Sequence, residues 1–163
     1  MGVEGVGFYE IAKNHPDRPA FLAPGEPTSY GELHAEVNRL SHALGELGLR
    51  PGDALATVLS NRPEFLTVLL AAFQSGLYLV PASRHLTAPE IGYILADSGA
   101  KAVVTENAFA GAVTRAADEA GIPHRIRRVG SMWTIYFTAD EVHDAATARK
   151  ADAARFGAFF GAL

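Results

Sequence analysis

The feature that most constrains this chain is a regular alternation of strand and helix signals, with a glycine where each main helix should stop. The expected strands span 55–59, 77–80 and 101–105, and the main expected helices span 30–47, 63–74, 88–97 and 107–120. Glycine is favoured after a helix because it tolerates the left-handed backbone that closes the last turn. Strand–helix units joined by short connections predict a parallel sheet covered by helices. The predicted fold class is therefore α/β, a sandwich of strand–helix units that contains a parallel sheet.

Three of these helices also carry start signals. Ser29 with Glu32, and Thr87 with Glu90, match the capping box, in which two side chains satisfy each other's exposed backbone amides. Asn61 and the proline at 63 stand where a helix cap and a first turn belong. A short helix at 8–12 and a brief strand at 20–23 are expected before them.

Two of the helices differ in how their apolar residues are distributed. The helix at 30–47 has leucines and a valine at spacings of three and four, which places them on one stripe. The helix that ends at Gln74 is apolar on nearly every side. We therefore expect the first helix to be buried along one face and the second on two sides, with the strand at 77–80 also buried.

After Gly121 the pattern changes to a short α+β piece. Two apolar strands are predicted at 126–129 and 132–138. A helix rich in Glu, Asp and Ala is predicted from about residue 145, and one of its faces carries Phe156, Phe159, Phe160 and Leu163. This face needs a partner surface. Packing against the sheet is the preferred interpretation, and a homo-oligomer formed through this Phe-rich helix is the alternative.

Composition excludes several classes of function. The 163 residues contain no cysteine, which excludes disulfides, thiolate metal sites and a cysteine nucleophile. The net charge of −4 offers no broad basic surface, so no nucleic-acid partner is expected. The most apolar stretch, 65–73, is far shorter than the roughly 20 residues that cross a bilayer. With no signal-peptide pattern at the start, we expect no membrane span and a cytoplasmic location.

Several motifs in the first two thirds of the chain resemble the adenylate-forming, AMP-binding superfamily. They are HPDRPAF at 15–21, TSYGEL at 28–33, GLRPGD at 48–53, LSN at 59–61 and GLYLVPASRHLTAPEIGYILADSGAKAVV at 76–104. The last motif is most similar to acyl-CoA synthetases that act on fatty acids, although Ser83 stands where such enzymes commonly have Asn. The resemblance covers residues 8–105 and is compatible with an extension to 129. It implies an enzyme that activates a carboxylate with ATP and passes the acyl group to coenzyme A.

The end of the chain resembles a different family. GSMWTIYFT at 130–138 and the residues that follow are similar to the C-terminal part of glutamate-1-semialdehyde aminomutases, which are class III aminotransferases. We therefore expect three parts: an acyl-CoA synthetase-like segment at 1–106, a junction of ambiguous origin at 107–129 and an aminomutase-like segment at 130–163. On this hypothesis the chain is a chimera of two fragments.

The printed sequence lacks groups that the chemistry of either family requires. Adenylation needs a Gly-rich loop that ends in Lys-Gly and holds the triphosphate, and it needs a later lysine. Neither group is present in the sequence. Lys101 and Lys150 are interpreted as solvated surface charges. Pyridoxal phosphate needs a lysine, an aspartate and a phosphate cup, which in the resembled family precede the segment found here. No cofactor is expected for this chain. The resemblances imply ATP, magnesium and coenzyme A for one parent family and pyridoxal phosphate for the other.

Ser83, Arg84 and His85 are the candidate substrate contacts. They follow the strand at 77–80, and ligands of open α/β sheets bind beyond the carboxyl ends of the strands. A plain connecting loop is the alternative interpretation. The six histidines show no metal-ligand spacing, because even His34 and His42 lie two helical turns apart, so no metal site is expected. No catalytic residue is assigned.

The resulting hypothesis is a catalytically incomplete fragment that resembles an ATP-dependent fatty acyl-CoA synthetase and is inactive alone. Three alternatives stay open: part of a split acyl-CoA ligase completed by a partner, a small acyl- or CoA-binding module, and the remnant of a pyridoxal-phosphate aminomutase. The sequence does not identify the carboxylic acid that the parent enzyme used.

Overall fold

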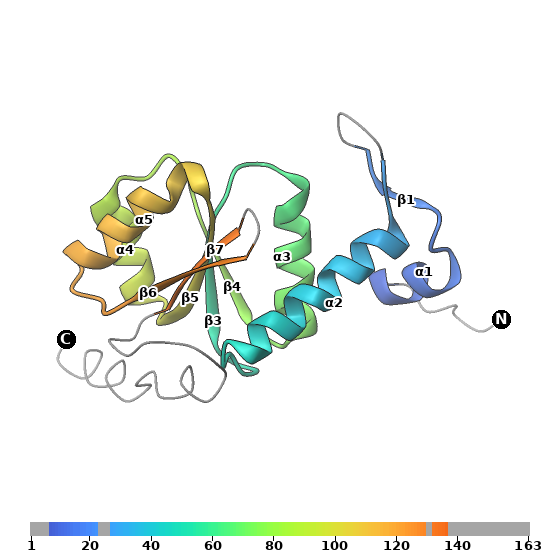
Figure 1. The fold of residues 1–163 in the computed structure, drawn as a ribbon, viewed down its shortest axis with the longest axis horizontal. Coiled ribbons are helices and arrows are strands. Elements are labelled where there is room, and N and C mark those ends of the chain that lie inside the picture. The colour runs from blue at the N-terminus through green and yellow to red at the C-terminus, as the bar shows by residue number, and fades with distance from the viewer. Residues whose placement is uncertain (1–6, 23–26, 130–131, 137–163) are drawn as a thin grey trace.

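A computed structural model of the chain describes residues 7–22, 27–129 and 132–136. Helices and strands alternate along it, as the sequence predicts (Figure 1). The helices are α1 (Phe8–Asn14), α2 (Tyr30–Glu46), α3 (Pro63–Gln74), α4 (Ala88–Asp97) and α5 (Asn107–Glu119). The strands are β1 (Pro19–Phe21), β2 (Thr28–Ser29), β3 (Ala54–Val58), β4 (Tyr78–Ala82), β5 (Ala100–Glu106), β6 (Arg125–Val129) and β7 (Met132–Tyr136). The predicted α/β class is confirmed.

Five strands form one sheet in the order β4-β3-β5-β7-β6. β3 pairs in parallel with β4 on one side and with β5 on the other. β7 runs antiparallel to β5, and β6 runs antiparallel to β7, so the two strands predicted after Gly121 extend the same sheet. β1 and β2 form a separate two-stranded antiparallel sheet, of which the sequence had indicated only the first strand. The predicted Phe-rich helix lies outside the described residues.

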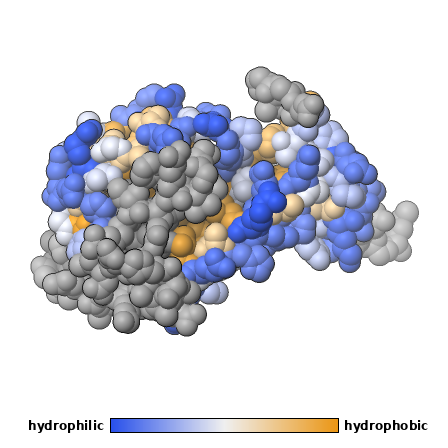
Figure 2. All heavy atoms as spheres, in the orientation of Figure 1, coloured by the Kyte–Doolittle hydropathy of each residue, from blue (hydrophilic) through white to orange (hydrophobic). Residues whose placement is uncertain are grey.

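Helices cover both faces of this sheet, which makes three layers (Figure 1). Alternate residues of β3 point to opposite faces. Leu55 packs into a core with α2 and α3, whereas Ala56 and Val58 pack into a second core with α4 and α5. Val68 of the first core and Leu95 of the second are completely buried. Figure 2 shows hydrophilic residues along α2 and hydrophobic residues reaching the surface between α2 and the sheet.

The helix signals in the sequence act as predicted. The Ser29 N–H donates to Glu32 Oε2 at 2.8 Å, and the Glu32 N–H donates back to Ser29 Oγ at 3.2 Å. The Thr87 N–H and hydroxyl both donate to Glu90 Oε2 at 2.7 Å. In each pair the bond from the backbone N–H is the main cause of a lowered pKa of the glutamate. The glycines at 48, 76, 99 and 121 all adopt positive φ after their helices.

The start of α3 differs from its prediction by one residue. Arg62, not Asn61, is the N-cap, and Pro63 occupies the first turn. The ring of a proline forces the preceding residue into an extended conformation. Arg62 adopts that conformation, with φ −125° and ψ 156°, and the helix can begin only after it.

The prediction that α3 is buried on two sides is wrong for the described part of the chain. Val68 and Ala71 on its inner face are fully buried. Leu66 is 38% exposed and Phe73 is 64% exposed, although both are large apolar residues. The outer face of α3 is therefore apolar and open to solvent.

β4 is an edge strand, not the buried strand that its apolar residues predicted. Among the described strands it pairs with β3 alone. The Tyr78 N–H donates to the Asp53 carbonyl at 2.9 Å, so the backbone groups of the alternate residues, Leu79 and Pro81, face outward. Since proline has no N–H, the outward edge lacks one of its donors.

Lys101 is more constrained than the predicted solvated charge. Its Nζ lies 2.7 Å from Asp53 Oδ1, at the amino end of the sheet. The Arg50 N–H donates to the other oxygen of the same carboxylate at 2.8 Å. The lysine thus ties β5 to the turn that precedes β3.

No helix in the described ranges is long and apolar enough to span a membrane.

Candidate functional site

A cleft of about 390 Å³ opens at the carboxyl ends of β3 and β4. The loop after β3 leads to α3 on one face of the sheet, whereas the loop after β4 leads to α4 on the opposite face. Neighbouring strands whose loops part in this way leave a crevice between them, and ligands of open α/β sheets bind there. The strand order thus accounts for the position of the cleft.

The cleft has a buried floor and a polar rim. Thr57 and Ala82, the last or next-to-last residues of their strands, are buried. The full lining is Thr57, Leu59, Ser60, Asn61, Phe65, Pro81, Ala82, Ser83, Arg84 and His85. A ligand with an apolar part against the leucine and the phenylalanine, and an anionic part near the arginine, would match this distribution of groups.

The three predicted substrate contacts, Ser83, Arg84 and His85, all line this cleft and are exposed. Ser83 Oγ accepts a hydrogen bond from the His85 N–H at 3.3 Å, which holds the loop in a local turn. Among the described residues, Arg84 has no acidic partner within ion-pair distance. The structure thus brings the three residues together at one cleft, and their contact with a substrate stays a prediction.

A polar network that the sequence did not indicate lies beside the cleft. The Ser60 N–H and hydroxyl both donate to Glu106 Oε1, at 3.0 and 2.5 Å. Arg62 donates to Glu106 Oε2 at 3.1 Å and forms a second ion pair with Glu64 at 2.8 Å. One residue before Glu106 in β5, the buried Thr105 hydroxyl donates to the Val58 carbonyl at 2.8 Å. Glu106 therefore fixes the loop after β3 to the end of β5.

The network favours the ionised form of Glu106. The hydrogen bond from the Ser60 hydroxyl is the main cause of a lowered pKa of Glu106, and the Ser60 N–H and Arg62 lower it further. The hydrogen bond that Arg62 donates to Glu106 is the main cause of a raised pKa of Arg62. Because Ser60 also lines the cleft, the Glu106 carboxylate holds one wall of it in place.

The sequence contained only some of the signals needed to predict this network. Ser60 lies in the LSN motif, and Glu106 directly follows a predicted strand. What the sequence could not supply was the strand order. Only the return of β5 to the side of β3, 46 residues later, brings Glu106 to Ser60.

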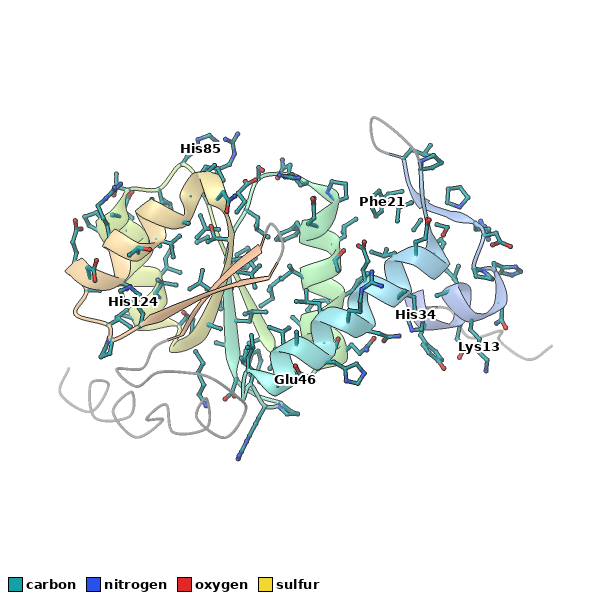
Figure 3. The ribbon with its side chains drawn as sticks, in the orientation of Figure 1. Lys13, Phe21, His34, Glu46, His85 and His124 are labelled. Carbon is teal, nitrogen blue, oxygen red and sulfur yellow. The ribbon has the colours of Figure 1, made fainter. Side chains whose placement is uncertain are left out.

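The described histidines do not gather into a metal site, and the rest of the described part of the chain holds no group of three His, Asp or Glu side chains that could bind a metal ion. Figure 3 shows His85 at the cleft end of the sheet, His34 near the start of α2 and His124 near α5. The Asn38 Nδ2–H donates to His34 Nε2 at 3.2 Å, and the His34 ring contacts the rings of Phe8 and Tyr9. It is a packing residue of the α1–α2 contact.

The sequence model of one protein family, described as AMP-binding enzyme, matches residues 8–156. The chain belongs to the AMP-binding enzyme family. The match runs through the junction predicted at 107–129 and through most of the segment predicted to be aminomutase-like. It therefore offers an AMP-binding origin for residues that the sequence motifs alone assigned to another family.

Individual AMP-binding proteins show the same relation. The chain is 38% identical over 107 residues to a fatty acid–[acyl-carrier-protein] ligase from Streptomyces coeruleorubidus. A benzoate CoA ligase from Burkholderia xenovorans superposes with a TM-score of 0.66 at 28% identity over 70% of this chain. The N-terminal domain of FACL13 from Mycobacterium tuberculosis gives a TM-score of 0.63 at 30% identity over 66% of the chain.

The matched region is a small part of each of these proteins. It covers 66% of this chain but 20% of the Streptomyces ligase. It covers 23% of the benzoate CoA ligase and 27% of the FACL13 N-terminal domain. The family and the fold therefore follow from the match, whereas the activity of a whole ligase does not.

Proposed function

We propose that this chain is part of the N-terminal domain of a ligase that activates a fatty acid with ATP, and that residues 1–163 do not complete the reaction alone. The observation that carries the proposal is the family match over residues 8–156, combined with the coverage of one fifth of the Streptomyces ligase. The proposed role of this part is to supply one wall of the substrate cleft at the ends of β3 and β4.

The residues present do not fit ATP. A triphosphate requires several converging backbone N–H groups and a lysine, as in a Gly-rich loop. The printed sequence has no such loop, and none of its three lysines lies within one. The cleft rim offers Arg84, which is suited to a single anionic group. ATP, magnesium and coenzyme A are therefore assigned to the parent family, and no step through them is assigned to these residues.

The direct test is ATP–pyrophosphate exchange, measured with the purified chain and fatty acids of several lengths. We expect no exchange above the protein-free blank. The split-ligase alternative predicts that exchange appears when a second polypeptide supplies the phosphate loop and the late lysine. Exchange by residues 1–163 alone would contradict the proposal.

The contact role of Ser83, Arg84 and His85 is proposed on the same basis. We expect Arg84→Ala to weaken the binding of an anionic acyl ligand, because it removes the rim charge that has no acidic partner in the described part of the chain. The matched control is Arg39→Ala, on the outer side of α2 and remote from the cleft lining. Equal binding by both variants would count against a role for this loop.

A second candidate function is a small acyl- or CoA-binding module, which the presence of the cleft itself favours. It predicts a rise in unfolding temperature with saturating acyl-CoA, because a ligand that binds only the folded state stabilises it. No rise with acyl-CoA or with a free fatty acid would remove this candidate.

The remaining proposals concern origin and place. An aminomutase origin of residues 130–163 competes with the AMP-binding match, which reaches residue 156. The aminomutase alternative predicts that the chain binds pyridoxal phosphate, and binding should change the visible absorbance of that cofactor. The boundaries at 106 and 129 are proposed as boundaries of origin, and resequencing codons 100–135 tests whether the join is present in the gene. A cytoplasmic location is proposed because the sequence has no cysteine, which fits a reducing compartment, and cell fractionation tests it.

A further inference from the structure

Thr57 carries a buried hydroxyl group that has no hydrogen-bond partner in the described part of the chain. Thr67 and Thr105 are buried as well, but the hydroxyl of each is paired. The Thr67 hydroxyl donates to Glu36 Oε2 at 3.5 Å. The Thr105 hydroxyl donates to the Val58 carbonyl at 2.8 Å. The Thr57 side chain is only 1% exposed, and no such bond joins it to another described residue.

An unpaired hydroxyl in this position has an energetic consequence. Folding removes the water that would otherwise bond to the group, and no protein group replaces that water. Buried polar side chains therefore nearly always have a partner, and an exception indicates that something else pairs with the group. At Thr57 a partner can come from the cleft, because this residue is part of the cleft lining.

The strand geometry places the Thr57 side chain on the same face of the sheet as α3. Leu55, two residues earlier in β3, packs in the core with α2 and α3, and residues two apart in a strand share a face. The register pairs Thr57 with Pro81 of β4. Both residues line the cleft together with Phe65 of α3. The hydroxyl thus belongs to the cleft floor, between the sheet and the start of α3.

The surrounding groups determine which chemistry could pair with this hydroxyl. Leu59, Phe65 and Pro81 make the neighbouring lining apolar. A charged ligand group would lose its hydration there without gaining an opposite charge, so a neutral polar group is favoured. A hydroxyl both donates and accepts, as the Thr57 hydroxyl does, so the two can pair in either direction. An anionic group fits the exposed rim instead, near Arg84.

We propose that Thr57 determines the specificity of the cleft, by pairing with a hydroxyl group on the apolar part of an acyl ligand whose anionic end lies near Arg84. The inference rests on the proposed function, because it takes the cleft as the place where an acyl ligand binds. It narrows the ligand class from fatty acids in general to hydroxy-substituted acids. An unsubstituted chain would leave the Thr57 hydroxyl unpaired, and it would bind more weakly for that reason.

The binding test uses calorimetry with the full chain and ω-hydroxy fatty acids of several lengths, each compared with the unsubstituted acid of the same length. At the length that spans the cleft, the hydroxy acid should bind about tenfold more tightly. Thr57→Val replaces the hydroxyl by a methyl group and should remove this preference. Thr57→Ser keeps a hydroxyl and should retain it.

A second measurement needs no ligand. In the isolated chain, Thr57→Val should leave the unfolding temperature unchanged or raise it, because the substitution removes an unpaired polar group. Thr105→Val is the matched control: the same change at a buried position of the neighbouring strand β5 removes a hydroxyl that donates to Val58. The control should lower the unfolding temperature by a few degrees. Equal losses in both variants would show that Thr57 has a partner within the chain, which would overturn the proposal.

The outcome is separable from that of the proposed function. Pyrophosphate exchange reports adenylation, and Arg84→Ala reports the anionic end of the ligand, whereas the preference for a hydroxy acid reports Thr57 alone. A preference that Thr57→Val removes would stand even if the chain carried out exchange by itself. Equal binding of hydroxy and unsubstituted acids, or binding of neither, would overturn the role of Thr57 and leave the family assignment intact. A water molecule that pairs with the hydroxyl would give equal binding.

Discussion

The two helical layers of this fold differ in how much of their apolar surface is buried within the described part of the chain. In the α4–α5 layer, helix packs closely on helix, and a Cβ added at Gly92 would lie 2.8 Å from the Ala116 carbonyl oxygen. In the α2–α3 layer, the inner residues are equally buried, but Leu66 and Phe73 on the outer side of α3 are exposed to solvent. Both layers cover the same sheet and share the strand β3.

The difference shows that the apolar composition of a helix does not determine how many of its sides are buried. The apolar residues of α3 make more than one side of the helix suited to packing. The described part of the chain packs against only one of these sides. The α4–α5 layer buries its core side chains Ile91, Leu95 and Val113 within this chain, so the stability of that core should be a property of the chain alone. The following variants test that contrast, beginning with the largest effect.

Leu95→Ala and Leu66→Ala compare the same substitution in the two layers. Leu95 is completely buried in the α4–α5 core, so its loss leaves a cavity and should lower the free energy of unfolding by about 2–5 kcal/mol. Leu66 is partly exposed on α3, and its loss should cost less than about 1 kcal/mol. Urea unfolding of the isolated chain measures both. Similar costs would mean that the outer face of α3 is covered in solution.

Gly92→Ala tests the close approach of α4 to α5. The added methyl would meet the Ala116 carbonyl oxygen at 2.8 Å and the Ala120 Cβ at 3.3 Å, so the helices must separate, at a cost of about 1–3 kcal/mol. Gly111→Ala is the control on α5, because a Cβ there meets nothing within 4 Å and alanine is the better helix former by about 1 kcal/mol. Chemical denaturation should show the two variants shifting stability in opposite directions.

Glu106→Gln tests the joint between the layers at the cleft. The loss of the charge weakens the hydrogen bonds from Ser60 and removes the ion pair to Arg62, which should cost about 1 kcal/mol at neutral pH. The Glu106 side chain is only 17% exposed, so solvent screens the pair incompletely.

The pH dependence of the same variant has a defined sign. The folded state lowers the pKa of Glu106, so its carboxylate stabilises the fold above the ordinary glutamate pKa. This contribution is lost as the pH falls through the lowered value. The unmodified chain should lose stability in acid more steeply than Glu106→Gln. Parallel acid profiles of the two proteins would contradict the assigned hydrogen bonds.

Much of the fold could be predicted because its signals are local. The capping boxes at Ser29 and Thr87 are set by residues three apart, and the helix-closing glycines by their own backbone. The burial predicted for α3 and for β4 depended on partners distant in sequence, and it was wrong. β4 reads as a buried strand because its residues are apolar, yet its edge position depends on where β5 inserts.

The candidate site divides in the same way. Ser83, Arg84 and His85 could be placed at the cleft because the carboxyl end of a parallel strand is a local prediction with a general consequence. Glu106 could not be paired with Ser60, because that bond depends on the order of strands across the sheet. Asn61 is the better capping residue type, but the extended conformation that Pro63 imposes on Arg62 makes Arg62 the cap.

Pro81 has a consequence for the behaviour of many copies of this chain at high concentration. A strand at the edge of a sheet is a template on which identical strands can add, and fibrils grow in this way when each backbone donor finds an acceptor in the next copy. At Pro81 that sequence of donors is interrupted. Endless extension of the sheet across its β4 edge is therefore disfavoured.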